Sequence, residues 1–213
     1  MDGIIIRNET EKDFGKVEML IREAFWNVNF PGCNEHYVAH VIRSHEDFIP
    51  ELDLVAELDG TIIGNVMYTK SKLVDEAGNE KDILTFGPLA VLPRYQRMGV
   101  GKALLEHSFD IAEKLGYDII VIFGNPGNYV SRGFKSCQKY NICLEGGVFP
   151  TAMLVKELKS GALDGRKMTF YESPAFDINE EKADEFDRSF PPKVKKYRTS
   201  QEEFYIYSHS AVN

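Results

Sequence analysis

Apolar residues in the first part of the chain recur at the spacing of a helix. They are separated by three or four positions, which places them on one helical face. These residues are Phe14, Val17, Ile21 and Ala24. Residues 10–13 supply a hydroxyl cap and acidic side chains for the first turn of this helix. A second helix is expected over residues 34–44, after the break at Pro31-Gly32.

Runs of β-branched and aromatic residues predict strands around and after these helices. Asp59-Gly60 separates two such runs, and this pair favours the positive φ angles of a tight hairpin turn. Proline cannot donate a hydrogen bond to a sheet, so Gly87-Pro88 predicts a bulge or a local loss of pairing within its strand. The expected strands are Gly3–Arg7, Asp53–Leu58, Thr61–Tyr68, Asp82–Leu92, Tyr117–Phe123 and Thr151–Leu158.

The order of these elements predicts a mixed α/β domain over residues 1–158. Residues 159–213 have a more polar texture and are expected to form a C-terminal extension packed on the domain. Within the extension we expect a charged helix over Asn179–Arg188 and an edge strand over Glu203–Tyr207. Its aromatic side chains favour packing because their exposure to water would be costly. These are Phe170, Tyr171, Phe176, Phe186, Phe190, Phe204 and Tyr205.

Composition and charge limit the classes of function. Of the 213 residues, 43% are hydrophobic, so the chain can build a sizeable core. The formal net charge of -8 argues against a nucleic-acid-binding surface, which is usually basic. The first residues do not resemble a signal peptide, and no apolar run is long enough to span a bilayer. We therefore expect a cytoplasmic protein without a membrane partner, and a homodimer stays open.

Cysteine and histidine residues do not indicate a metal site. The 3 cysteines include no CxxC pair and are expected to be reduced and apolar in character. His36 and His40 lie four positions apart on the second expected helix, but no HExxH motif or acidic set completes a ligand sphere. We therefore expect a solvated or half-buried helix face there, and no metal.

A glycine-containing loop stands between an apolar strand and an amphipathic helix. Glycines let the backbone approach a ligand, and the exposed amides at a helix N-terminus favour an anion such as pyrophosphate. The loop and first helical turn are Gln96, Arg97, Met98, Gly99, Val100, Gly101 and Lys102. Ala103 occupies the hydroxyl position of a Walker loop, and Leu104 occupies the third glycine position of a dinucleotide fingerprint. A nucleotide-binding function is therefore disfavoured.

Two segments together carry a resemblance to a known family. LAVLPRYQRMGVGKALL and the downstream GNPGNYVSRGF resemble the GNAT superfamily of N-acetyltransferases, and the resemblance covers about residues 1–158. It implies acetyl-CoA as the donor and a fold in which two neighbouring strands splay apart at a bulge. It also implies backbone contacts from Leu89, Ala90 and Val91 to the pantetheine and thioester, and a pyrophosphate cradle at residues 96–102. Asn125 matches the asparagine near the pantetheine arm, and Tyr129 matches the tyrosine that protonates the departing thiolate.

The acceptor side is less defined. Many members of this superfamily carry a glutamate on the strand before the bulge, but Thr85-Phe86-Gly87-Pro88 has none. Glu35, His36 and a chain of waters stay open as the general base. The resemblance implies acetyl transfer to a primary amine of a small molecule or peptide. The alternative is a non-catalytic acyl-CoA-binding regulatory module with the same fold.

Overall fold

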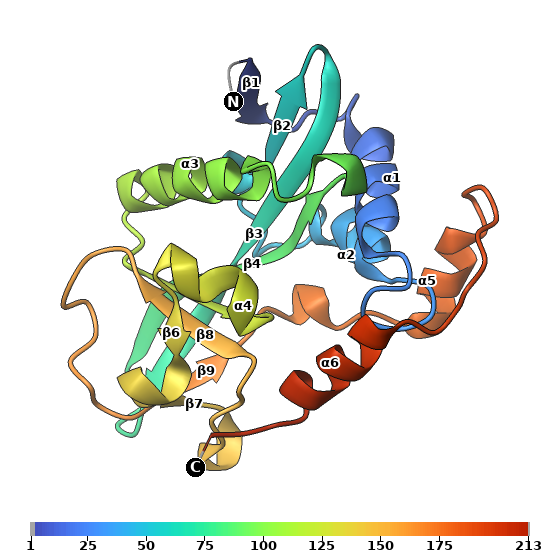
Figure 1. Ribbon diagram of the computed structural model, residues 1–213. Coiled ribbons are helices and arrows are strands. Elements are labelled where there is room, and N and C mark those ends of the chain that lie inside the picture. The colour runs from blue at the N-terminus through green and yellow to red at the C-terminus, as the bar shows by residue number, and fades with distance from the viewer. Residues whose placement is uncertain (1–2, 213) are drawn as a thin grey trace.

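The protein folds around a mixed nine-stranded sheet with helices on both faces (Figure 1). A computed structural model describes residues 3–212. The strands are β1 Ile4–Asn8, β2 Leu54–Leu58, β3 Thr61–Asp75, β4 Glu80–Val91, β5 Ile119–Phe123, β6 Lys135–Ser136, β7 Ile142–Cys143, β8 Met153–Glu157 and β9 Met168–Tyr171. The helices are α1 Phe14–Phe25, α2 Glu35–Ile42, α3 Val100–Lys114, α4 Pro126–Tyr129, α5 Glu180–Asp187 and α6 Thr199–Ser208. The predicted fold class is thereby confirmed.

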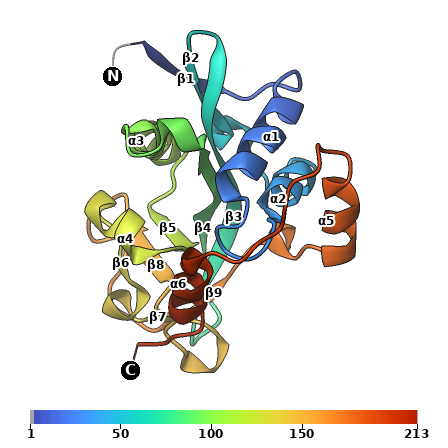
Figure 2. The same cartoon turned by 45° about the vertical axis from the view of Figure 1, so that its right-hand side comes forward.

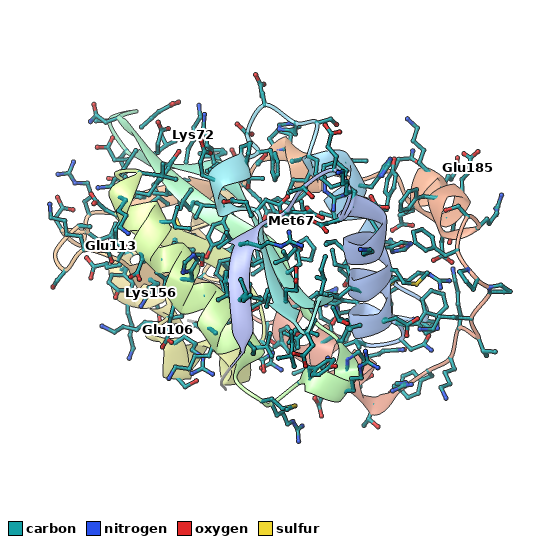
Figure 3. The ribbon with its side chains drawn as sticks, turned by 90° about the horizontal axis from the view of Figure 1, so that it is seen from above. Met67, Lys72, Glu106, Glu113, Lys156 and Glu185 are labelled. Atoms are coloured by element: carbon teal, nitrogen blue, oxygen red, sulfur yellow. The ribbon has the colours of Figure 1, made fainter. Side chains whose placement is uncertain are left out.

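Alternating side chains divide the sheet into two faces. On β2, Leu54 and Ala56 pack in the same cluster as the apolar face of α3, whereas Val55 packs with α1 and α2. Met67 of β3 belongs to the α1 side. Figure 3 shows α1 and α3 on opposite sides of the strands, with Glu106 on the outer side of α3. The two helical layers therefore enclose β2, β3 and β4 from both faces.

The predicted bulge lies at Gly87-Pro88. In the pairing of β3 with β4, Val66 is opposite Leu89, and Tyr68 is opposite Phe86. One residue of β3 therefore faces two residues of β4, which is the arrangement that defines a bulge. The proline accordingly sits where the regular ladder is interrupted.

The predicted splay follows directly after this pairing. β4 and β5 are parallel neighbours, and their ladder consists of the single pair Leu84↔Ile120. Beyond that pair the two strands diverge, so the second half of β4 keeps its bonds to β3 and has no strand on its β5 side. This leaves a free backbone edge in the middle of the sheet.

The C-terminal extension is built into the domain. β9 pairs antiparallel with β3 and parallel with β7, so the extension contributes a strand to the sheet. α5 lies within the expected charged helix and begins after the cap Asn179, whose side chain accepts a hydrogen bond from the backbone N–H of Lys182 at 2.9 Å. Figure 2 shows α5 beside α2, and α6 in front of the lower half of the sheet near α4. The boundary at residue 158 stays a prediction.

The expected edge strand over Glu203–Tyr207 is wrong, because these residues lie in α6. The aromatic residues of this segment have high strand propensity, but tertiary packing overrides propensity here. The α6 residues that face the interior are spaced by three and four positions, as one helical face requires. They are Ser200, Glu203, Phe204, Tyr207 and Ser208.

Candidate active site

The glycine loop connects β4 to the N-terminus of α3. Arg97 and Gly99 have positive φ angles of 60° and 87°, and Gly99 is the residue that caps α3. The side-chain amide of Gln96 donates a hydrogen bond to the carbonyl of Val91 at 3.0 Å, which ties the loop to the end of the strand. Val100 is only 1% exposed and packs in the core, so only its backbone faces the loop.

Gly101 has room for a side chain, which separates it from a glycine required for packing. A Cβ atom at Gly101 would meet only the Val91 side chain, at 3.7 Å. At Gly64 a Cβ atom would lie 3.0 Å from side chains of Leu104 and Val100. A side chain at position 64 would therefore crowd its neighbours, whereas one at position 101 would not. The missing side chain at 101 leaves the first turn of α3 open to a ligand.

A cavity of about 600 Å³ lies where β4 and β5 diverge. One wall is the bulged segment Thr85–Leu89, and another is the end of β5 with Asn125 and Tyr129. The face of α6 completes the enclosure. Of the backbone segment expected to face a pantetheine, Leu89 lines the cavity, while the side chain of Ala90 is buried toward α1. The structure thus brings the bulge, Asn125 and Tyr129 together.

Tyr129 is held in the cavity wall by aromatic packing. Its ring centroid lies 5.7 Å from those of Phe86 and Phe134. Gly124 allows this position, because a Cβ atom there would lie 2.6 Å from the ring. Burial, with a smaller contribution from Tyr207, raises the pKa of Tyr129 to about 12. The phenol therefore keeps its proton at neutral pH and can donate it.

Asn125 has a structural contact as well as its place in the cavity wall. Its side-chain oxygen accepts a hydrogen bond from the backbone N–H of Gly127 at 2.9 Å, which caps α4. Because α4 carries Tyr129, this cap fixes the start of the helix that positions the phenol. Lys102, in the first turn of α3, is exposed, and its Nζ lies 3.5 Å from Oε1 of Glu106.

Of the two side chains considered as a base, only Glu35 lines the cavity. Its carboxylate accepts hydrogen bonds from the Asn29 side-chain amide at 2.8 Å and the backbone N–H of Asn34 at 3.0 Å. Burial raises the pKa of Glu35 above its usual range, although these hydrogen bonds oppose the shift. Glu35 therefore combines access to the cavity with a proton affinity suited to a base.

His36 is fully buried, so the expected solvated or half-buried helix face is wrong at this position. Its Nε2 lies 3.1 Å from the Asp187 carboxylate, and its Nδ1 lies 3.5 Å from the Cys33 sulfur. Burial lowers the pKa of His36 to about 4. His40 does lie on the exposed side of the helix. Within residues 3–212, no group of three potential metal ligands occurs.

The extension supplies cavity residues that sequence reasoning missed. Glu172 follows β9, and Glu203 and Tyr207 lie one turn apart on α6. The spacing of Ser200, Glu203, Phe204, Tyr207 and Ser208 was the signal that could have identified this helical face. Glu172 carried no such signal, because a single glutamate after a short strand is an ordinary surface residue.

Comparison with known proteins defines the class. The profile of the "Acetyltransferase (GNAT) family" matches residues 19–135, and the chain belongs to this family. It is 28% identical over 163 residues to the uncharacterized N-acetyltransferase YhbS of Escherichia coli, covering 76% of this chain and 92% of that protein. The chain is therefore an acyltransferase of the acetyl-CoA-dependent type, as the sequence predicted.

Solved structures share the fold of this chain. The crystal structure of Escherichia coli YhbS in complex with CoA has a TM-score of 0.70 and 25% identity, covering 83% of this chain and 93% of that one. A GNAT acetyltransferase from Brucella melitensis, crystallised with acetyl-CoA, has a TM-score of 0.64 and 22% identity over 83% and 99% of the two chains. No helix in the described part of the chain is long and apolar enough to cross a membrane.

Proposed function

We propose that the protein transfers the acetyl group of acetyl-CoA directly to a primary amine of a small molecule or peptide. The observation that carries this proposal is the cavity at the divergence of β4 and β5, which joins a free strand edge to a protonated tyrosine. A regulatory module that only binds acyl-CoA would not need Tyr129 there. The enzyme is therefore favoured over the binding module.

The donor side of the cavity fits an extended chain that ends in a pyrophosphate. Backbone groups of Leu89, Ala90 and Val91 lie on the free edge of β4 and can pair with amides of a pantetheine arm. Residues 96–102 would surround the pyrophosphate with backbone amides, and Arg97 and Lys102 add positive charge. Asn125 would approach the pantetheine from the opposite wall. When bound, acetyl-CoA supplies the thioester that the amine attacks.

Tyr129 and Glu35 would move the two protons of the reaction. Glu35 accepts a proton from the acceptor ammonium, directly or through water, because only the neutral amine is nucleophilic. Tyr129 donates its phenolic proton to the sulfur as the C–S bond breaks, which makes the leaving group a thiol. The proton that the attacking nitrogen loses on forming the amide restores the phenol. Burial raises the pKa of both groups, which increases the proton affinity of Glu35 and keeps Tyr129 protonated at neutral pH.

The proposal is tested first at the donor side. Acetyl-CoA should raise the melting temperature of the protein, and ATP at equal concentration should leave it unchanged. Release of CoA thiol should then be measured with a panel of amines. Equal stabilisation by ATP, or no thiol release with any primary amine, would contradict the proposed function.

A further inference from the structure

Three glutamates from separate elements line the cavity. Glu35 begins α2, Glu172 follows β9 and Glu203 lies on α6. Within residues 3–212, none of the three forms an ion pair. The described lining also contains no lysine, arginine or histidine. The described cavity lining therefore holds three carboxyl groups and no basic side chain to pair with them.

The extension forms the wall that carries most of these carboxyl groups. Glu203 and the neighbouring Glu202 on α6 are both exposed, but of the two only Glu203 lines the cavity. Phe176 continues the wall to the bulge, since a Cβ atom at Gly87 would lie 3.4 Å from its ring. The extension therefore reaches from α6 to the strand edge where the acetyl group would lie.

Burial, and to a smaller extent neighbouring charges, shift the pKa values of two cavity residues. Desolvation in the cavity, followed by repulsion from Asp177, raises the pKa of Glu172 to about 7. Burial, then Glu203 and Glu35, raises the pKa of Tyr207. A bound cation close to these carboxylates would relieve the repulsion and stabilise their charged forms.

The remainder of the cavity is mostly apolar. Its walls include Phe25, Val28, Val38, Phe123 and Phe204. Such walls suit methylene groups, because burial of apolar surface is favourable. Asn29, Asn128 and Ser200 add hydrogen-bonding groups between the apolar side chains. An acceptor that fits this lining has an alkyl chain and a positive charge at each end.

We infer that the acceptor is a diamine or polyamine, whose far ammonium group binds between Glu172 and Glu203 while its near amine is acetylated. This inference rests on the proposed function, in which Glu35 serves the reacting amine. An acceptor with a carboxylate at the far end would be repelled by the same side chains. The extension is thus the part of the chain that selects the acceptor.

Three acceptors of equal chain length test this inference. Hexamethylenediamine, hexylamine and aminocaproate differ only in the far group, which is cationic, apolar or anionic. We expect kcat/KM for the diamine to exceed that for hexylamine by at least about tenfold, since one favourable charge contact in a partly enclosed site has this magnitude. Aminocaproate should be the poorest acceptor. Equal kcat/KM values for the diamine and hexylamine would overturn the inference.

Matched variants assign the effect to particular side chains. Glu203→Gln and Glu172→Gln should each lower kcat/KM for hexamethylenediamine by about threefold or more, through KM, and should lower hexylamine turnover by much less. Glu202→Gln is the control on the same helix and should change neither. The inference is overturned if Glu202→Gln has the same effect as Glu203→Gln, or if hexylamine turnover falls as far as diamine turnover.

Binding measurements separate this inference from the function on which it rests. Calorimetry with acetyl-CoA tests the donor site alone, and hexamethylenediamine is then titrated into the protein saturated with CoA. If acetyl-CoA binds and the diamine does not, the acceptor class is wrong and the donor site is retained. If acetyl-CoA does not bind, both fail. Diamine binding that Glu203→Gln weakens and Glu202→Gln preserves supports the inference even before turnover is measured.

Discussion

The Arg22 guanidinium donates two hydrogen bonds to the Asp187 carboxylate, from Nε at 2.6 Å and from Nη2 at 3.2 Å. The two residues lie 165 positions apart and join α1 to α5. Arg22 is 1% exposed and also donates to the carbonyl of Pro191 at 3.0 Å. A buried bidentate pair of this kind fixes geometry as well as charge. It therefore fastens the extension to the domain beside the cavity.

Removal of this carboxylate should destabilise the protein strongly. Asp187→Ala leaves the buried Arg22 without its counter-charge, and such losses cost about 3–5 kcal/mol. Asp184→Ala is the control on the same helix, because its pair with Lys195 is exposed and should be worth less than about 1 kcal/mol. Urea unfolding of both variants measures the difference. Similar losses in the two variants would contradict the role of Arg22–Asp187.

His36 predicts a specific acid sensitivity of folding. Its pKa is about 4 in the folded protein, below the ordinary value of 6.5, so the unfolded chain binds the proton more readily. Stability should therefore decline as pH falls from about 6.5 to about 4, by up to about 1.4 kcal/mol per pH unit. His36→Gln should remove this slope, whereas His40→Gln, at the exposed histidine of the same helix, should keep it. Unfolding free energies measured across this pH range give the three slopes.

Tyr129→Phe tests the proposed acid. The change keeps the ring between Phe86 and Phe134 and deletes the hydroxyl group. We expect kcat to fall by a factor on the order of 10 to 100, with acetyl-CoA affinity nearly intact. Tyr140→Phe, which does not alter the cavity, should behave as the wild type. An unchanged kcat in Tyr129→Phe, where chemistry limits the rate, would rule out the acid role.

Glu35→Gln tests the proposed base through the pH profile. In the wild type, kcat/KM should rise with pH as Glu35 loses its proton, at a pH above the usual range for glutamate because its pKa is raised. Glutamine cannot ionise, so the residual kcat/KM of Glu35→Gln should not show this rise with pH. Glu57→Gln, at a glutamate outside the cavity that pairs with Arg7, should retain the rise. If kcat/KM of Glu35→Gln still rises with pH in the same range, another group is the base.

Gly101 and Gly64 should respond in opposite ways to substitution. Gly101→Val meets little steric resistance within the fold, so acetyl-CoA affinity should drop by much more than stability. Gly64→Val forces atoms against Leu104 and Val100, so stability should fall by about 1–3 kcal/mol. Calorimetry and urea unfolding on each variant provide the comparison. If a folded Gly101→Val protein keeps its acetyl-CoA affinity, the loop is an ordinary turn and does not bind the pyrophosphate.

The sequence predicted the parts of the site that local signals encode. The bulge followed from Gly87-Pro88, and the donor loop from glycines at a strand-to-helix junction. Asn125 and Tyr129 were named from the family resemblance of the short segment after β5; the structure places both in the cavity wall, and their roles stay predictions. The bulge and the glycine loop needed only neighbouring residues, since the backbone conformation there is set by glycine and proline.

The acceptor wall could not be predicted in this way. α6 contains the stretch EFYIY, whose aromatic residues favour a strand. Its helical conformation and its cavity-facing side chains are known only from its packing in the fold. Glu172 enters the wall because β9 pairs with β3, a contact between residues about a hundred positions apart. Burial of His36 likewise depends on α5, which arrives from the far end of the chain. These features depend on contacts between residues far apart in the sequence, and the spacing of apolar residues does not reveal such contacts.

The position of α6 beside the cavity affects how the acceptor preference of this enzyme can change through mutation. Glu203 and Tyr207 lie outside residues 19–135, the part of the chain that carries the family signature. Mutations in the extension can therefore change which amine is accepted while the donor loop stays intact. A library limited to residues 172–208 is a suitable starting point for evolving new acceptors, because the proposed site for the far ammonium group lies in this segment and the donor loop lies outside it.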